Sequence, residues 1–153
     1  TYDSGNESSL VQFEKPNGAY MGRIRQSGST AVDYVSASDI RLKTEIEPTE
    51  YSLENLLQIE VMDYYFKDDK TREGRQTGFI AQQLYEHYPK AVDVGSENLE
   101  EQPWGVAYGM LTPLLVKAVQ DLNAEKDGLR ELVQDQQEVI QQLLDRVSQL
   151  EQQ

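Results

Sequence analysis

The sequence contains no cysteine, and its 153 residues include one histidine and one tryptophan. The lack of cysteine excludes disulfides, thiolate catalysis and cysteine-ligated zinc. The lone His87 has no second imidazole with which to bind a metal, so we expect no metal and no other cofactor. We expect His87 to lie at the surface or at a helix end, with a catalytic role as the alternative.

Positive charge is also scarce, because 14 Lys and Arg stand against 27 Asp and Glu, giving a net charge of -13. A surface of this sign repels nucleic acid and anionic lipid, so we expect neither as a partner. No apolar run approaches the roughly 20 residues that a membrane span needs. With 38% apolar residues the chain can bury only a modest core, and we expect a soluble segment of a larger protein.

The first 37 residues are rich in Gly, Ser and Asn and hold no long apolar cluster. This pattern predicts short strands and turns that cannot form a core alone. The stretch "AYMGRIRQSG" alternates polar and apolar residues and predicts an edge strand. An edge strand needs neighbours for its backbone hydrogen bonds, and other copies of the chain can supply them.

From residue 38 to about residue 108 the pattern predicts a small α+β body. The stretch "DIRLKTEI" alternates with period two and predicts a half-buried strand, which Pro48 ends. The stretch "EVMDYYF" predicts a second strand, and "GFIAQQLYEHYP" predicts a helix that ends at Pro89. A short helix is also expected at "SLENLLQI", capped by Ser52, with three leucines facing inward: Leu53, Leu56 and Leu57. Trp104 lies in a predicted loop, either as a packing anchor or in a binding site.

The last region, residues 109–153, predicts one long helix. Beyond Lys126 a heptad register places Val133, Ile140 and Val147 at position a, and Leu129, Gln136, Leu143 and Leu150 at position d. Such a helix would extend about 60 Å, too far to pack within so small a body. We expect it to form a coiled coil, and periodicity alone leaves dimer and trimer open. The alternative is an amphipathic helix folded back over its own core, with Gly128 as a kink.

One pair of residues offers a reaction. A serine and a lysine suffice for acyl transfer when the lysine amine is neutral and accepts the serine proton. Ser38 and Lys43 are five residues apart, a separation that points to opposite faces of a strand about 16 Å apart or to positions about 140° apart around a helix. Either the chain turns sharply between them, or the lysine of one subunit serves the serine of another.

Three blocks of sequence resemble a known family. They are "SDIRLKTEI", "GFIAQQLYEHYPKAV" and "YGMLTPLLVKAVQDLNAE", in this order. Together they resemble the C-terminal intramolecular chaperone, or auto-processing, domain of phage tail spikes, tail fibres and neck appendages. A similar module occurs in an animal membrane-bound transcription factor. The resemblance covers about residues 38–122 with specific motifs, and the rest of the helix in character only.

The resemblance implies a domain that trimerises, guides folding of the fibrous segment before it, and cuts itself away. On this chain the cut falls between Ala37 and Ser38, with Ser38 as nucleophile and Lys43 as base. Asp39 and Arg41 match the remaining motif positions. The expected setting is a tail fibre or tail spike precursor assembled in the host cytoplasm, from which the chaperone fragment is released.

We therefore predict an α+β fold in three parts. Residues 1–37 form the distal end of a β fibre or spike, residues 38–108 the auto-processing body, and residues 109–153 the helix of a trimeric coiled coil. The expected partners are two further copies of the chain and the upstream fibre segment. One alternative is a trimerisation and attachment domain that is never cut. Another is a glycan-cleaving or receptor-binding tip, which lacks an identifiable acid pair.

Overall fold

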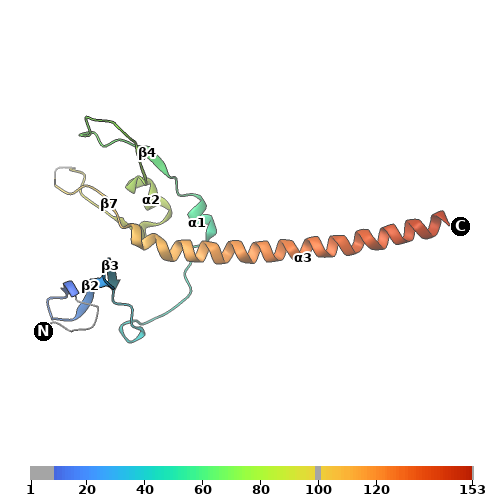
Figure 1. Cartoon of the computed structure of the whole chain (residues 1–153), viewed down its shortest axis with the longest axis horizontal. Coiled ribbons are helices and arrows are strands. Elements are labelled where there is room, and N and C mark those ends of the chain that lie inside the picture. The colour runs from blue at the N-terminus through green and yellow to red at the C-terminus, as the bar shows by residue number, and fades with distance from the viewer. Residues whose placement is uncertain (1–8, 99–100, 153) are drawn as a thin grey trace. The chain divides into compact units, whose positions relative to one another are not determined.

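The computed structural model describes residues 9–98 and 101–152 and has the predicted α+β composition. The chain divides into two compact units, Thr1–Pro48 and Thr49–Gln153. The first is a small sheet followed by an irregular segment, and the second joins a small mixed body to a long helix (Figure 1). Within the described residues, no helix combines the length and apolarity that crossing a membrane requires.

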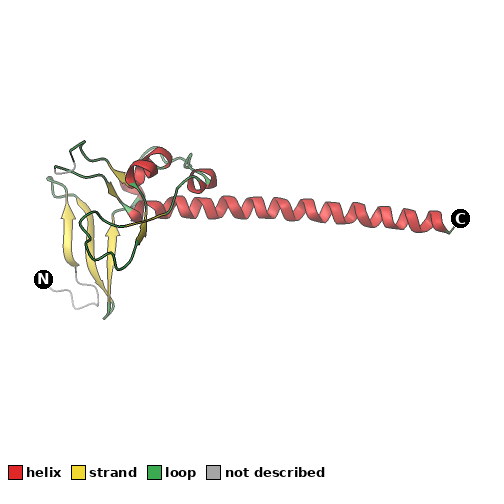
Figure 2. Ribbon diagram, turned by 90° about the horizontal axis from the view of Figure 1, so that it is seen from above, coloured by secondary structure: helices red, strands yellow, loops and turns green. Residues whose placement is uncertain are grey.

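The first unit contains three antiparallel strands, β1 (Ser9–Glu14), β2 (Tyr20–Ser27) and β3 (Ala31–Ser36), in the order β1-β2-β3. Figure 2 draws them as neighbouring yellow arrows. The prediction that the second of these strands lies at an edge is wrong, because β1 and β3 pair with its two sides. The β2–β3 turn contains Gly28 at φ 59°, a conformation that glycine adopts without steric cost.

The sheet has one apolar face that none of the described residues of its own unit covers. Cross-strand pairing places Val11, Ile24 and Tyr34 on the same face, and Val32 lies two residues before Tyr34 on that face. Tyr34 is 82% exposed. Gly22 is the one residue between positions 9 and 36 that is buried. A sheet with this exposure has too little buried apolar surface to be stable alone.

The strand predicted over residues 39–46 is wrong. The chain instead makes one turn of 3-10 helix, η1 (Ile40–Leu42), and then continues without regular structure to residue 52. The aliphatic residues that gave the alternating pattern are exposed, with Ile40 at 71% and Leu42 at 70%. Period-two alternation over so few residues does not distinguish a strand from a turn whose side chains reach solvent.

The second unit builds a small core against the start of its long helix. It contains α1 (Leu53–Leu57), the hairpin of β4 (Met62–Tyr64) and β5 (Gln76–Gly78), α2 (Ala81–His87) and the pair β6 (Val92–Asp93) and β7 (Gly105–Val106). The single-turn helices η2 (Pro89–Ala91) and η3 (Tyr108–Met110) lead into β6 and α3 respectively. The core cluster consists of Leu84, Tyr88, Ala91, Leu111 and Leu114. His87 is half-buried at the last position of α2, where the sequence predicted a helix end.

Helix α1 agrees with the prediction in position and N-cap, but not in all of its inward residues. Ser52 is the N-cap, and its backbone N–H donates to Asn55 Oδ1 at 3.0 Å. Leu57 is 74% exposed, so its predicted inward orientation is wrong. The Leu53 N–H donates to Asp121 Oδ2 at 3.1 Å, which ties α1 to the long helix.

The long helix α3 (Leu111–Glu151) runs through Gly128 without a break. Its first turns bury Leu111, Leu114 and Ala118 against the body. Every described residue from 122 to 152 is exposed, and Figure 1 shows this part extending away from α1 and α2. The alternative of a helix folded back over its own core is therefore wrong.

Candidate functional site

The predicted cleavage site begins where the sheet ends. Strand β3 ends at Ser36, and the next backbone N–H, that of Ala37, donates to Met21 O at 2.8 Å. This bond continues the β2–β3 hydrogen bonding by one residue. It fixes the residue that would supply the acyl group of the Ala37–Ser38 peptide bond.

Immediately after that peptide bond the chain folds into the η1 turn. Asp39 is the N-cap, and the Leu42 N–H donates to Asp39 O at 3.0 Å. The Lys43 N–H then donates to Ile40 O at 3.1 Å. These two bonds form one turn of 3-10 helix, which shortens the path between Ser38 and Lys43 relative to a strand.

The turn brings the predicted nucleophile and base into contact within one chain. Lys43 Nζ donates to Ser38 Oγ at 2.8 Å. Of the two geometries that the sequence left open, the sharp turn is therefore the one found in the single chain. A hydrogen bond of this length is within the reach required of a nucleophile and its general base.

Asp39 and Arg41 form a second contact inside the same turn. Asp39 Oδ1 accepts from the Arg41 N–H at 2.8 Å and from Arg41 Nε at 3.0 Å, while Oδ2 accepts from Nη2 at 2.6 Å. The Arg41 side chain and then its backbone N–H lower the pKa of Asp39. Asp39 in turn raises the pKa of Arg41. All four predicted site residues therefore meet in one turn of the chain.

The four residues are exposed in the single chain. A serine–lysine pair works only when the lysine is neutral, and burial favours the neutral form. The contact geometry that acyl transfer needs is present in this chain, and the burial is not.

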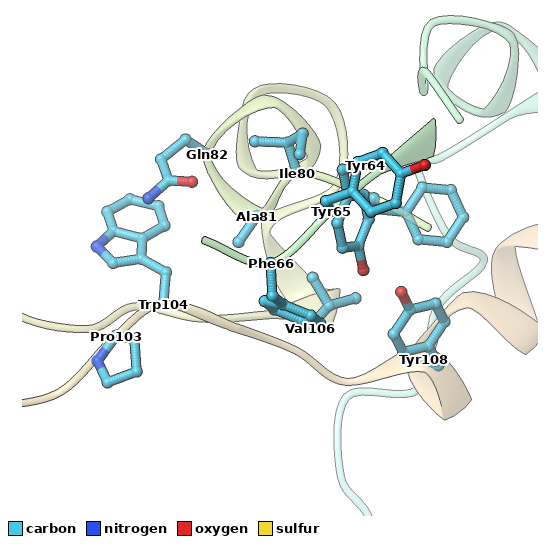
Figure 3. Close-up of a pocket in the computed structure, with 11 residues that line it drawn as sticks. Tyr64, Tyr65, Phe66, Ile80, Ala81, Gln82, Pro103, Trp104, Val106 and Tyr108 are labelled. Atoms are coloured by element: carbon cyan, nitrogen blue, oxygen red, sulfur yellow. The ribbon is translucent and has the colours of Figure 1, made fainter. Parts of the chain in front are cut away.

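A second feature, of which the sequence analysis named only Trp104, is an aromatic groove of about 470 Å³ in the other unit (Figure 3). Trp104 lies at one end of the groove beside Gln82 in that view, and its ring also packs edge-on against Tyr85 at 5.5 Å. Trp104 is thus both a packing residue and part of the groove lining. The cluster "DYYF" at residues 63–66 was the sequence signal for this groove, since three consecutive aromatic residues there line it.

Comparison with known proteins gives one family. Residues 38–93 match the model of the peptidase family described as chaperone of endosialidase. A search of curated proteins gave no match. The match begins at Ser38 and includes the whole η1 turn, α1, α2 and the β4–β5 hairpin. It confirms the resemblance noted from the sequence and supports a chaperone role. Residues 38–93 are thus similar to the family of C-terminal intramolecular chaperones that the sequence motifs resemble.

Proposed function

We propose that this chain is an intramolecular chaperone that trimerises, holds the β segment before it in register, and frees that segment by cutting between Ala37 and Ser38. The observation that carries the proposal is the 2.8 Å contact from Lys43 Nζ to Ser38 Oγ. It lies directly after the last hydrogen bond of the sheet. The family match supports the chaperone part of the proposal.

The proposed reaction uses the two ends of that contact. Neutral Lys43 accepts the hydroxyl proton of Ser38 while Ser38 Oγ attacks the carbonyl carbon of Ala37. The C–N bond breaks, and the proton passes from the lysine to the released amine of Ser38. The resulting ester between Ala37 and Ser38 Oγ is then hydrolysed by water. The products are a carboxylate at Ala37 and a fragment whose first residue is Ser38 with its hydroxyl restored.

Assembly supplies the burial that the single chain lacks. Ser38 and Lys43 are exposed in one chain, so surfaces of other copies must cover them before the lysine amine becomes neutral near physiological pH. Cutting would then follow trimer formation. This order protects an unfolded chain from losing its chaperone too early.

The exposed stripe of α3 supports self-association. It contains the predicted a and d positions, and the same register continues upstream of Lys126 along the part of the helix that carries the body. The exposed residues at these upstream positions are Leu115 (d), Val119 (a) and Leu122 (d). The body contacts the adjoining side of the helix, through Leu111, Leu114 and Ala118 at positions g, c and g. The a and d stripe is therefore free to meet two further copies along most of α3.

The β1–β3 sheet supports the chaperone role because it needs further protein surface to be stable. Its apolar face is exposed in the single chain, so these strands gain stability only from further protein surface. Pairing between chains is slow because the entropy of bringing distant segments together is lost before contacts form. A C-terminal trimer raises the local concentration of three such segments and aligns them. We propose a phage tail fibre or tail spike as the upstream protein.

Intact mass and N-terminal sequencing of the expressed chain test the cut. We expect a fragment beginning at Ser38, and we expect Ser38→Ala and Lys43→Ala to leave the chain whole. Ser36→Ala and Lys67→Ala are matched controls that remove an exposed serine and an exposed lysine elsewhere, and both should be cut like the parent. If Ser38→Ala is still processed at the same bond, the proposed nucleophile is wrong.

Removing residues 123–153 tests the order of events. The truncated chain keeps Ser38, Lys43 and the buried start of α3, but it loses most of the exposed stripe. We expect light scattering to give three chains per particle for the full chain and one for the truncated chain, which should remain uncut. Undiminished cutting in a monomeric truncation contradicts the proposed coupling. A full-length trimer that is never cut favours the alternative of a retained attachment domain.

A further inference from the structure

The η1 turn is too short to hold its own shape. It has three residues, and a single helical turn fixes several backbone dihedrals for few hydrogen bonds. The cap contact from the Arg41 N–H to Asp39 Oδ1 at 2.8 Å therefore matters for the distance between Ser38 and Lys43. A neutral asparagine or serine cap would make this backbone contact equally well.

The guanidinium group of Arg41 makes more hydrogen bonds to Asp39 than a helix cap requires. Arg41 Nε donates to both oxygens of Asp39, at 3.0 and 3.1 Å, and Nη2 donates to Oδ2 at 2.6 Å. Both carboxylate oxygens are thus engaged by the guanidinium group. The Arg41 side chain is 85% exposed, so these hydrogen bonds bury little surface, and their effect is on the charge of Asp39.

Lys43 Nζ lies 2.8 Å from Ser38 Oγ, on the residue next to Asp39, so an Asp39 carboxylate without its arginine would compete with Ser38 for the lysine. A charge-assisted bond from an ammonium to a carboxylate is about twice as strong as a neutral hydrogen bond. Such a pairing also favours the charged ammonium, which cannot take a proton from a serine. Among the ion pairs within the described residues, none includes Lys43. The other acidic residues close by in sequence, Glu45 and Glu47, are exposed.

We infer that Asp39 and Arg41 are positioning residues for the self-cleavage. Asp39 caps the turn that sets the Ser38–Lys43 contact, and Arg41 neutralises Asp39 so that its carboxylate does not take Lys43 from Ser38. The inference rests on the proposed function and assigns a role to the two motif residues that the sequence left without one. The charges of Asp39 and Arg41 balance each other. Removing one should therefore shift the protonation of Lys43 in the opposite direction to removing the other.

Three variants separate this role from a merely structural one. Arg41→Gln leaves the carboxylate unpaired, Asp39→Asn keeps a cap acceptor but leaves the arginine charge, and the double variant removes both charges. Each chain is unfolded in urea and refolded by dilution into buffers that span a range of pH. The cleavage rate is measured only on the fraction of chains that has formed trimers. The readout is the pH at which the rate is half-maximal.

For Arg41→Gln we expect this pH to rise by about one unit, because a nearby carboxylate holds the ammonium charged. For Asp39→Asn we expect a fall of similar size, and for the double variant a value close to the parent. Arg41→Lys keeps the positive charge but not the paired guanidinium hydrogen bonds, and its midpoint should lie close to that of the parent. An unmoved midpoint in both single variants overturns the inference whatever happens to the rate, since a structural pair changes the rate alone.

The same titration can be followed without cleavage. In the Ser38→Ala background, the ¹³Cε resonance of Lys43 reports the protonation of its amine, and the two single variants should move its midpoint in the same opposite directions. Unmoved midpoints there overturn the inference even if the parent is never cut. The two claims can fail separately. If cleavage requires Ser38 but neither Arg41→Gln nor Asp39→Asn moves the midpoint, the proposed function stands and this inference is wrong.

Discussion

Two neighbouring leucines of α3 face different surroundings, and replacing each by alanine separates the body core from the proposed coiled coil. Leu114 is 2% exposed and belongs to the core cluster. Leu115 is 48% exposed and occupies a d position of the heptad register. The two substitutions delete the same atoms one residue apart, so helix propensity cancels between them.

The expected magnitudes differ with assembly. Leu114→Ala should lower the free energy of unfolding by about 2–5 kcal/mol per chain, because it leaves a cavity in a small core. Leu115→Ala should cost only about 0.5 kcal/mol in a single chain, as surface substitutions do. In a trimer the exposed half of Leu115 becomes buried, which is worth about 1 kcal/mol per chain and about 3 kcal/mol per trimer.

Urea unfolding followed by circular dichroism at several protein concentrations measures both effects. A background of Ile140→Asp and Leu143→Asp places charges in the seam and should yield monomers. In that monomeric background, Leu114→Ala should still lower the free energy of unfolding by its full amount. Leu115→Ala should cost only the small amount expected for a surface substitution. If Leu115→Ala costs as much as Leu114→Ala in the monomer, the division of α3 into a body face and a seam face is refuted.

Three further outcomes follow from local geometry. Gly128→Ala should stabilise α3 by about 1 kcal/mol in thermal unfolding, since a Cβ there meets nothing within 4 Å; a lower melting temperature contradicts this. Gly78→Ala should cost about 1–3 kcal/mol because its Cβ would lie 2.6 and 3.1 Å from two tyrosine hydroxyls, whereas Gly74→Ala, with open space, should be tolerated. Equal urea midpoints for the two would oppose the close packing. The hydrogen bond from Lys117 lowers the pKa of Asp121, so its contribution to stability is complete above the unfolded value near 4 and is lost as the pH falls through the folded value; Asp121→Asn should flatten this acid limb, and an unchanged limb argues against it.

The sequence predicted best where one period runs through many residues. The apolar repeat from Leu129 to Leu150 specified a helix that the structure extends from Leu111 to Glu151. It did not separate the body-facing side from the exposed stripe upstream of Lys126, because both sides are apolar there. Which side packs on the body depends on residues far away in the chain, such as Leu84.

Short segments were predicted less well. The residues after Ser38 alternate like a strand, yet the bonds between Asp39 and Arg41 make a turn more favourable. Side chain to backbone bonds of this kind compete with strand formation, and an alternating pattern does not contain them. The site residues themselves came from the family motif rather than from geometry, and only the three-dimensional turn explains how a lysine five positions away reaches Ser38.

Between Leu115 and Leu150, the exposed stripe of α3 contains two polar positions, Lys126 at a and Gln136 at d. In the proposed trimer these two residues would fix the axial register of the three helices. An axial slip of one heptad, about 10 Å at 1.5 Å per residue, would set the Lys126 layer against Val133 and the Gln136 layer against Leu143. Each slipped layer would bury an amine or an amide without a partner, at a cost of about 1–3 kcal/mol per group.

Because the body is packed on the first turns of the same rigid helix, whatever fixes the height of Lys126 and Gln136 also fixes the height of the three bodies. A one-residue slip would rotate a helix by about 100° and turn its stripe out of the bundle. Two polar side chains, Lys126 and Gln136, would thus place the three bodies at the same height along the bundle.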